Sequence, residues 1–139
     1  MITEIFTPLR KAVQNEKIYI AVVFLIICTG VCVFEQVTIN NVYTKTSEII
    51  NTALELNEGK KFEEAKEECI KLRTIWQGEY PYLSAMIDHA QLDSANLAIK
   101  ATKDIRKDDE DELSEKLIDA KNEIQILKEN QSITLGNIF

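Results

Sequence analysis

The chain has 139 residues, of which 45% are hydrophobic and 28% are charged, and its formal net charge is −7 at pH 7. Residues 35–139 alone hold 21 acidic and 13 basic side chains, a net charge of −8. An acidic domain repels a phosphate backbone, so nucleic acid is excluded as a partner. Cys69 is the only cysteine after residue 34, which excludes an internal disulfide there and leaves apolar packing to stabilise the domain.

An uncharged apolar run occupies residues 18–34, between Lys17 and Glu35. As a helix this run is about 25 Å long, near the lower limit for the ~30 Å hydrocarbon core of a bilayer. It is longer than the apolar region of a cleaved signal peptide, and no A-x-A pattern follows it. We therefore predict an uncleaved single-pass transmembrane helix at residues 18–34. A cleaved signal and a buried soluble helix are the alternatives.

Basic residues decide the predicted orientation of this helix. Arg10, Lys11 and Lys17 precede it, whereas the first basic residue after it is Lys45. The positive-inside rule therefore predicts a cytoplasmic tail at residues 1–17 and an extracytoplasmic C-terminal domain at the cell membrane. Apolar residues repeat at helical spacing within the tail, which is either a short interfacial helix or a partly ordered segment.

Cys28 and Cys32 are four residues apart and thus lie on one face of the predicted span. One interpretation is a contact between small residues of neighbouring helices. The other is a lipidation site or a disulfide-linked dimer.

Residues 35–60 are predicted to form a membrane-proximal helix and a turn. One apolar stripe marks the helix: Val42, Ile49, Ile50, Ala53 and Leu56. The Thr- and Asn-rich stretch 38–46 has low helix propensity, which indicates a hinge, although a helix continuous with the span is the alternative. Gly59 is suited to the left-handed position after the helix end.

Residues 61–131 are predicted to form a helical domain. Two of its helices carry apolar residues at alternating spacings of three and four, which indicates lengthwise packing on a neighbour. The first of these seams consists of Phe62, Ala65, Cys69, Leu72 and Trp76. The second seam, in a helix at about 109–130 that Asp108 or Asp109 can cap, consists of Leu113, Leu117, Ala120, Ile124 and Leu127.

Between these two helices, a third helix is predicted from Pro81 to Arg106, with the proline in its first turn. Its main stripe, widened by Met86, Leu92 and Ile99, consists of Leu83, Ile87, Ala90, Leu97, Ala101 and Ile105. The predicted fold class is therefore all-α: an N-terminal transmembrane helix followed by a small antiparallel bundle or hairpin stack of three to four helices.

His89 is the only histidine, and Asp93 follows it by four residues. The two side chains share a helix face, which predicts a hydrogen-bonded imidazole–carboxylate pair. One histidine and one aspartate do not make a metal site. The sequence also shows no set of nucleophile, base and orienting group. We therefore predict a protein that is not an enzyme, with no catalytic, cofactor-binding or metal-binding residue.

Aromatic and apolar residues supply the remaining candidates for an interaction surface. Trp76, near Tyr80 and Tyr82, is either a core anchor or part of an aromatic recognition patch. Residues 132–139 are apolar and would be costly to leave in water, so this tail folds back or meets a partner. The candidate interaction residues are Trp76, Tyr80, Tyr82, His89, Asp93, Ile138 and Phe139.

A tryptophan, an I-D-H-x-x-L-D pattern and a late L-x-N-I-F pattern together resemble an uncharacterised family. Its members are small, single-pass membrane-anchored helical proteins of Gram-positive, mostly endospore-forming bacteria, grouped as a domain of unknown function. The matching residues are Trp76, Ile87, Asp88, His89, Leu92, Asp93, Leu135, Asn137, Ile138 and Phe139. The resemblance is good over residues 70–139 and extends to residues 1–60 only in layout. It implies the fold and topology predicted above and, through host range alone, a link to sporulation.

Three functional hypotheses follow. In the leading one, the extracytoplasmic acidic domain docks on another envelope or membrane protein. In the second, the chain is a self-assembling membrane scaffold: the two seams pair between chains, and Cys28 and Cys32 lie at a dimer face of the span. In the third, the domain is an extracytoplasmic sensor in which His89 titrates near about pH 6–7 and loosens its pairing with Asp93.

Overall fold

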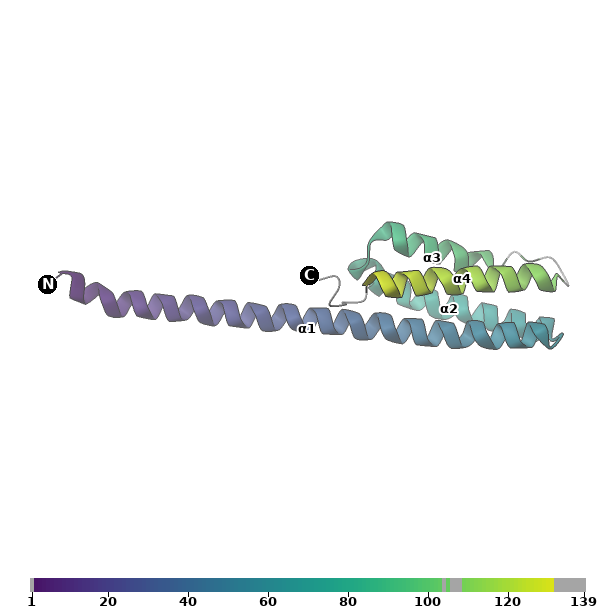
Figure 1. Cartoon of the computed structure of the whole chain (residues 1–139), viewed down its shortest axis with the longest axis horizontal. Helices are drawn as coiled ribbons and strands as arrows, with labels where there is room; N and C mark the ends of the chain where they lie inside the picture. Colours follow the sequence, from purple (N-terminus) through teal and green to yellow (C-terminus); the bar gives the residue numbers. More distant parts are fainter. Residues whose placement is uncertain (1, 104, 106–108, 132–139) are drawn as a thin grey trace. The chain divides into compact units, whose positions relative to one another are not determined.

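The computed structural model describes residues 2–103, 105 and 109–131, with side chains from residue 14 onward. The described residues form helices and no strand, which confirms the all-α class. The elements, labelled in Figure 1, are α1 (Ile2–Glu58), α2 (Phe62–Met86), α3 (His89–Ala101) and α4 (Glu110–Gln131).

The chain divides into two compact units, Met1–Glu35 and Gln36–Phe139. In the first unit, the large apolar side chains of residues 18–34 are exposed; Ile20 is 65% and Phe24 66% exposed. Among the residues that the structure describes, one helix, α1, is long and apolar enough to cross a membrane, and none of its most apolar window is buried within the protein. The predicted span at residues 18–34 lies within this helix.

The second unit has one apolar core, to which all four helices contribute. Every residue predicted for the two seams is buried, on α2 and on α4 alike. Figure 1 shows α3 and α4 side by side, in agreement with their many close contacts. On α1, four of the five predicted stripe residues are buried and Leu56 is half-buried. Two polar residues of α1, Thr46 and Asn57, are buried among them.

The predicted hinge at residues 38–46 is wrong, because α1 is helical throughout this stretch. Two threonine hydroxyls of this stretch donate to the carbonyl four residues earlier: Thr44 Oγ1 to Asn40 at 2.9 Å and Thr46 Oγ1 to Val42 at 2.7 Å. These bonds satisfy the hydroxyls inside the helix, so they no longer favour another backbone conformation.

The turn after α1 is also shifted by one residue from the prediction. Lys60, not Gly59, has the positive φ, at 64°. The amide of Gly59, directly after the last residue of α1, still donates to the Glu55 carbonyl at 3.0 Å, so Gly59 itself is not the left-handed residue. The amides of Lys60 and Lys61 then donate to the carbonyls of Asn57 and Leu56, as in a Schellman motif with Lys60 at the left-handed position.

The helix predicted from Pro81 to Arg106 is divided between two elements. Pro81 lies inside α2, which continues to Met86, and α3 begins at His89. The true start signal is Asp88, whose side chain accepts a hydrogen bond from the Ala90 amide at 2.8 Å. Ile87 before it is extended, with φ −114° and ψ 148°. Asp88 therefore caps α3, a stronger local signal than the proline.

This break changes the phase of the apolar stripe. Leu92, Ala95 and Ile99 form the buried face of α3, at spacings of three and four. Leu97, which was predicted to be buried, is 68% exposed, and Ala90 is exposed as well. A prediction that carried one helical phase through residues 81–106 therefore assigned these two residues to the wrong face.

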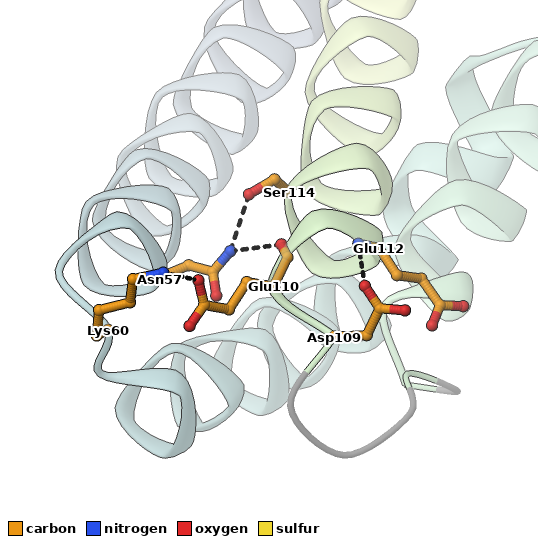
Figure 2. A network of polar contacts seen from close by, with 6 residues as sticks. All are labelled: Asn57, Lys60, Asp109, Glu110, Glu112 and Ser114. Atoms are coloured by element: carbon orange, nitrogen blue, oxygen red, sulfur yellow. Dashed lines mark hydrogen bonds and ion pairs between the residues drawn. The ribbon is translucent and has the colours of Figure 1, made fainter.

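Figure 2 shows polar contacts between the end of α1 and the start of α4. Asn57 is 2% exposed, and its Nδ2 donates to the Glu110 carbonyl and to Ser114 Oγ, both at 2.8 Å. Lys60 Nζ pairs with the Glu110 carboxylate, which raises the pKa of Lys60 through that hydrogen bond and the attached charge. Asp109 Oδ1 accepts from the Glu112 amide at 3.0 Å, which confirms the predicted cap at Asp109. Asp108 lies outside the described residues.

Candidate functional site

Trp76 belongs to the core rather than to the surface. Its side chain is 1% exposed, and its indole Nε1 donates to Asn96 Oδ1 on α3 at 3.2 Å. Burial together with a satisfied N–H is typical of a core tryptophan. Of the two interpretations of Trp76, the structure therefore agrees with the core anchor.

Tyr80, one turn further along α2, joins a second residue of the candidate set. Its hydroxyl donates to Asp93 Oδ1 on α3 at 3.0 Å. This hydrogen bond is the main reason that the pKa of Tyr80 is raised, since ionisation of the phenol would remove the donor next to a carboxylate. Tyr80 is half-buried and Asp93 is exposed.

The predicted pairing of His89 with Asp93 is wrong. Among the residues that the structure describes, no hydrogen bond or ion pair joins these two side chains, and both are exposed. His89 occupies the first position of α3, directly after the capping Asp88, while the Asp93 carboxylate is engaged by Tyr80 from α2. The sensor hypothesis depended on a pH-sensitive His89–Asp93 contact and therefore loses its structural basis.

Three exposed residues nevertheless share one side of α3. His89, Asp93 and Leu97 follow one another at intervals of four, which places them in a row along the helix. We call these three residues the α3 outer row. Leu97 is its apolar member, and sequence reasoning missed it. The sequence signal for its exposure is the Asp88 cap. A helix that begins directly after this cap and buries Leu92, Ala95 and Ile99 has Leu97 on its opposite side.

The remaining candidate residues are not brought into this row. Tyr82 is 67% exposed, but it lies two residues after Tyr80 and thus about 200° around α2. Ile138 and Phe139 lie outside the described residues. The structure therefore brings Tyr80 into contact with Asp93 and places His89, Asp93 and Leu97 on one exposed side of α3. Trp76 lies in the core, and Tyr82 lies on another side of α2.

The described residues offer no metal-binding cluster of three or more His, Cys, Asp or Glu side chains. An open groove of about 480 Å³ lies between α3 and α4. It is lined by small and polar side chains: Ser94, Ala98, Ala101, Lys116, Asp119, Asn122 and Glu123. This lining contains no cysteine or histidine.

The three cysteines are free and differ in environment. Cys69 is buried in the core, and desolvation of its thiolate raises the pKa of the thiol to about 11. In the first unit, Cys28 is half-buried and Cys32 is exposed. A thiol as deeply buried and as weakly acidic as Cys69 is a core side chain rather than a nucleophile.

Comparison with known proteins places residues 33–138 in one family. No curated protein and no solved structure matches the chain. Residues 33–138 match the family described as a domain of unknown function, DUF4363. This match agrees with the expectation of an uncharacterised family and covers most of the 139 residues. The chain therefore belongs to the DUF4363 family.

Proposed function

We propose that this chain is a non-enzymatic, single-pass membrane protein whose second unit docks on another membrane or envelope protein. The anchor in this proposal is residues 18–34 of α1, whose large apolar side chains are exposed. Apolar area of this extent is costly in water and favourable in a bilayer. The basic residues Arg10, Lys11 and Lys17 favour a cytoplasmic N-terminus and an extracytoplasmic second unit.

Within the second unit, the proposal requires a rigid antiparallel bundle that presents α3. Hydrogen bonds support this arrangement, because residue numbers rise on one helix as they fall on its neighbour. Between α1 and α4 the bonded pairs are Gln36–Gln131, Asn51–Lys121 and Asn57–Glu110. Between α2 and α3 they are Arg73–Thr102, Trp76–Asn96 and Tyr80–Asp93.

The docking surface in this proposal is the α3 outer row, and the exposure of Leu97 is the observation that carries it. An apolar side chain that is 68% exposed can be covered by an apolar residue of a partner. Asp93, held by the Tyr80 hydroxyl, supplies a positioned carboxylate one turn away. The net charge of −8 over residues 35–139 favours a partner with a basic surface, mainly by accelerating encounter.

Replacement of Leu97 by serine tests this surface, with Ile118→Ser on α4 as the matched control, since Ile118 is also exposed, at 47%. The full chain is crosslinked in host membranes, and the captured proteins are quantified. We expect Leu97→Ser to reduce the main crosslinked product at least about tenfold, a loss of about 1.4 kcal/mol, while Ile118→Ser leaves it unchanged. Equal capture by both variants and the parent would refute docking through α3.

A separate experiment tests the orientation. Single cysteines at position 5 or position 130, in a background without the three native cysteines, are labelled on intact cells with a membrane-impermeant thiol reagent. Labelling of Asn130→Cys alone supports an extracytoplasmic second unit. Labelling of Ile5→Cys alone would invert the topology and make the protein a cytoplasmic adaptor held at the membrane.

A self-assembling scaffold is the second candidate, and it is favoured by Cys32, which is free and exposed one turn from Cys28. The seams of α2 and α4 are buried within one chain, so they are not available to pair between chains. Assembly would therefore use the first unit. The molecular mass in detergent, compared between the parent and a Cys28→Ala, Cys32→Ala variant, separates this candidate from the first.

A further inference from the structure

A second groove of the second unit lies beside the N-terminal part of its α1 segment and has a volume of about 340 Å³. Its lining comes from α1 and from one residue of α4: Gln36, Val37, Ile39, Asn40, Asn41 and Lys128. None of these described residues is acidic, whereas the groove between α3 and α4 includes Asp119 and Glu123. Within a region whose net charge is −8, this groove therefore suits an anionic ligand.

The polar groups of the lining are donors that a phosphate accepts. Lys128 is half-buried, and its Nζ lies 4.1 Å from the centre of the Tyr43 ring, a contact that holds the ammonium beside the groove. Asn40 and Asn41 are exposed, and their side chains make no hydrogen bond with any described residue. Their amide N–H groups are therefore available to a ligand. An ammonium and two amides together can donate to several oxygens of one phosphate.

The chain itself keeps this groove close to the predicted span, whatever the arrangement of the two units. Gln36 follows Phe34 by two residues and thus lies at most about 7 Å from it. Residues 36–41 then extend over about 8 Å of α1. The headgroup layer on each side of the hydrocarbon core is about 5–8 Å thick. With residues 18–34 in a membrane, as proposed above, the groove begins at the depth of the lipid headgroups.

We propose that this groove binds the headgroup of a membrane phospholipid, with its phosphate on Lys128 and on the amides of Asn40 and Asn41. This site rests on the membrane anchor proposed above and not on docking through the α3 outer row. Val37 is 53% exposed and precedes the two asparagines, so the apolar part of the lining is nearer to the span in the chain than the amides are. A phospholipid changes from acyl chain to phosphate in the same direction. A soluble phosphate ester would leave Val37 uncovered, which favours the lipid.

Binding of a headgroup here gives the second unit a fixed position on the membrane. Lys128 belongs to α4 and the two asparagines belong to α1, so one lipid contacts two helices of the bundle. An anionic leaflet repels an acidic domain as a whole. A local cationic site opposes this repulsion at the one end of α1 that is already linked to the span.

Lipid titration of the full chain tests the site. The parent and its variants, in an uncharged detergent, are titrated with phosphatidylglycerol, which carries an anionic phosphate, and bound lipids are counted by native mass spectrometry. Lys128→Gln removes the cation from the groove. The matched control is Lys116→Gln, because Lys116 is also a half-buried lysine of α4 and lines the groove that contains acidic side chains. Flotation with phosphatidylglycerol vesicles shows separately whether each chain inserts into a membrane.

We expect Lys128→Gln to weaken binding of the first lipid about fivefold, since one lysine near an anionic membrane surface contributes about that factor. Lys116→Gln and Lys128→Arg should both bind like the parent. Asn40→Ala combined with Asn41→Ala should also weaken binding, and because both asparagines are exposed, this variant tests the site without disturbing the core. Leu97→Ser on the α3 outer row should have no effect.

Equal weakening by Lys128→Gln and Lys116→Gln would indicate a general effect of charge and overturn the proposal. So would displacement of the lipid by glycerol phosphate at the same concentration as by phosphatidylglycerol, which would assign the groove to a soluble phosphate ester. A parent chain that floats with vesicles but shows none of the expected differences would refute the lipid site alone. A parent chain that does not float would refute the membrane anchor, and the lipid site with it.

Discussion

In the first unit, Ile20, Phe24 and Leu25 are each about two thirds exposed, whereas in the second unit Leu72 and Leu117 are fully buried. The residue types are the same, and the difference lies in their pattern. Residues 18–34 are apolar on every side of the helix, so no single neighbouring helix could cover them. The apolar residues of α2 and α4 recur every three or four positions, and neighbouring helices of the same chain cover them. The spacing of apolar residues along the helix thus distinguishes the two units. The apolar side chains of residues 18–34 need to be covered by something outside the chain, whereas those of α2 and α4 are covered by the chain itself.

The substitutions with the largest expected effect test whether residues 18–34 of the first unit lie in a membrane. Leu25→Lys with Ile26→Lys places two charges in the middle of the apolar run, which costs about 5–7 kcal/mol in a membrane-spanning helix. We expect the full chain to disappear from the membrane fraction in flotation assays. The control puts lysines at Ile70 and Ile118, which are exposed apolar positions of α2 and α4. Retention of the first variant in the membrane would show that residues 18–34 do not form the anchor.

Two adjacent apolar residues of α4, one buried and one exposed, allow the effect of burial on stability to be measured inside the second unit. Leu117 is 0% exposed and Ile118 is 47% exposed. Leu117→Ala should reduce the free energy of unfolding by about 2–5 kcal/mol through lost burial and the cavity that remains. Ile118→Ala should change it by less than about 1 kcal/mol. Urea unfolding of the full chain in detergent, followed by circular dichroism, measures both, and similar losses would contradict the observed orientation of α4.

Burial of Cys69 in the second unit makes the free energy of unfolding depend on pH. Burial raises the pKa of its thiol from 9.0 to about 11, so the folded chain keeps a proton that the unfolded chain loses above about pH 9. Fewer protons on the unfolded chain mean that stability falls as the pH rises from 9 to 11, by about 2 kcal/mol. The difference in unfolding free energy between the parent and Cys69→Ala, measured at pH 8 and pH 11, isolates this contribution from other alkaline titrations. A difference that does not change with pH would mean that the thiolate is solvated in the folded state.

The same comparison explains what could be read from the sequence. The seams of α2 and α4 were predictable because their periodicity is unbroken from one end of each seam to the other. The register of α3 was not, because Pro81 offered a start signal that the structure does not use, and Asp88 supplied the one that it does. A proline inside a helix loses one backbone hydrogen bond, a cost that packing of neighbouring residues can offset.

The candidate site was only half predictable for a related reason. His89 and Asp93 were selected because residues four apart share a helix face, which is correct for α3. That rule does not include other helices, and the Tyr80 hydroxyl from α2 is the group that contacts Asp93. The exposure of Leu97 follows only from the correct phase of α3. Contacts between helices that are distant in sequence need the packed structure.

The smallest expected effect concerns Asn57, which with Thr46 is one of two polar residues among the buried residues of α1. Its Nδ2 donates two hydrogen bonds to α4, but its Oδ1 is buried and makes no hydrogen bond with any described residue. Asn57→Ala removes the two bonds, which destabilises, and also removes an unpaired buried acceptor, which offsets part of the loss. We expect a net decrease of about 1 kcal/mol in the free energy of unfolding.

The control for Asn57→Ala is Lys60→Ala, which breaks the exposed ion pair with Glu110 at the same end of the unit and should change stability less, since solvent and salt screen that pair. Both variants are compared by urea unfolding at low and at high salt. If Lys60→Ala lost as much stability as Asn57→Ala, and its loss vanished at high salt, the surface charges rather than the buried amide would hold α1 against α4. A loss confined to Asn57→Ala and unchanged by salt would mean that the buried amide fixes the start of α4 against the end of α1. An apolar side chain at position 57 could not do this, because it would offer no hydrogen bond to α4.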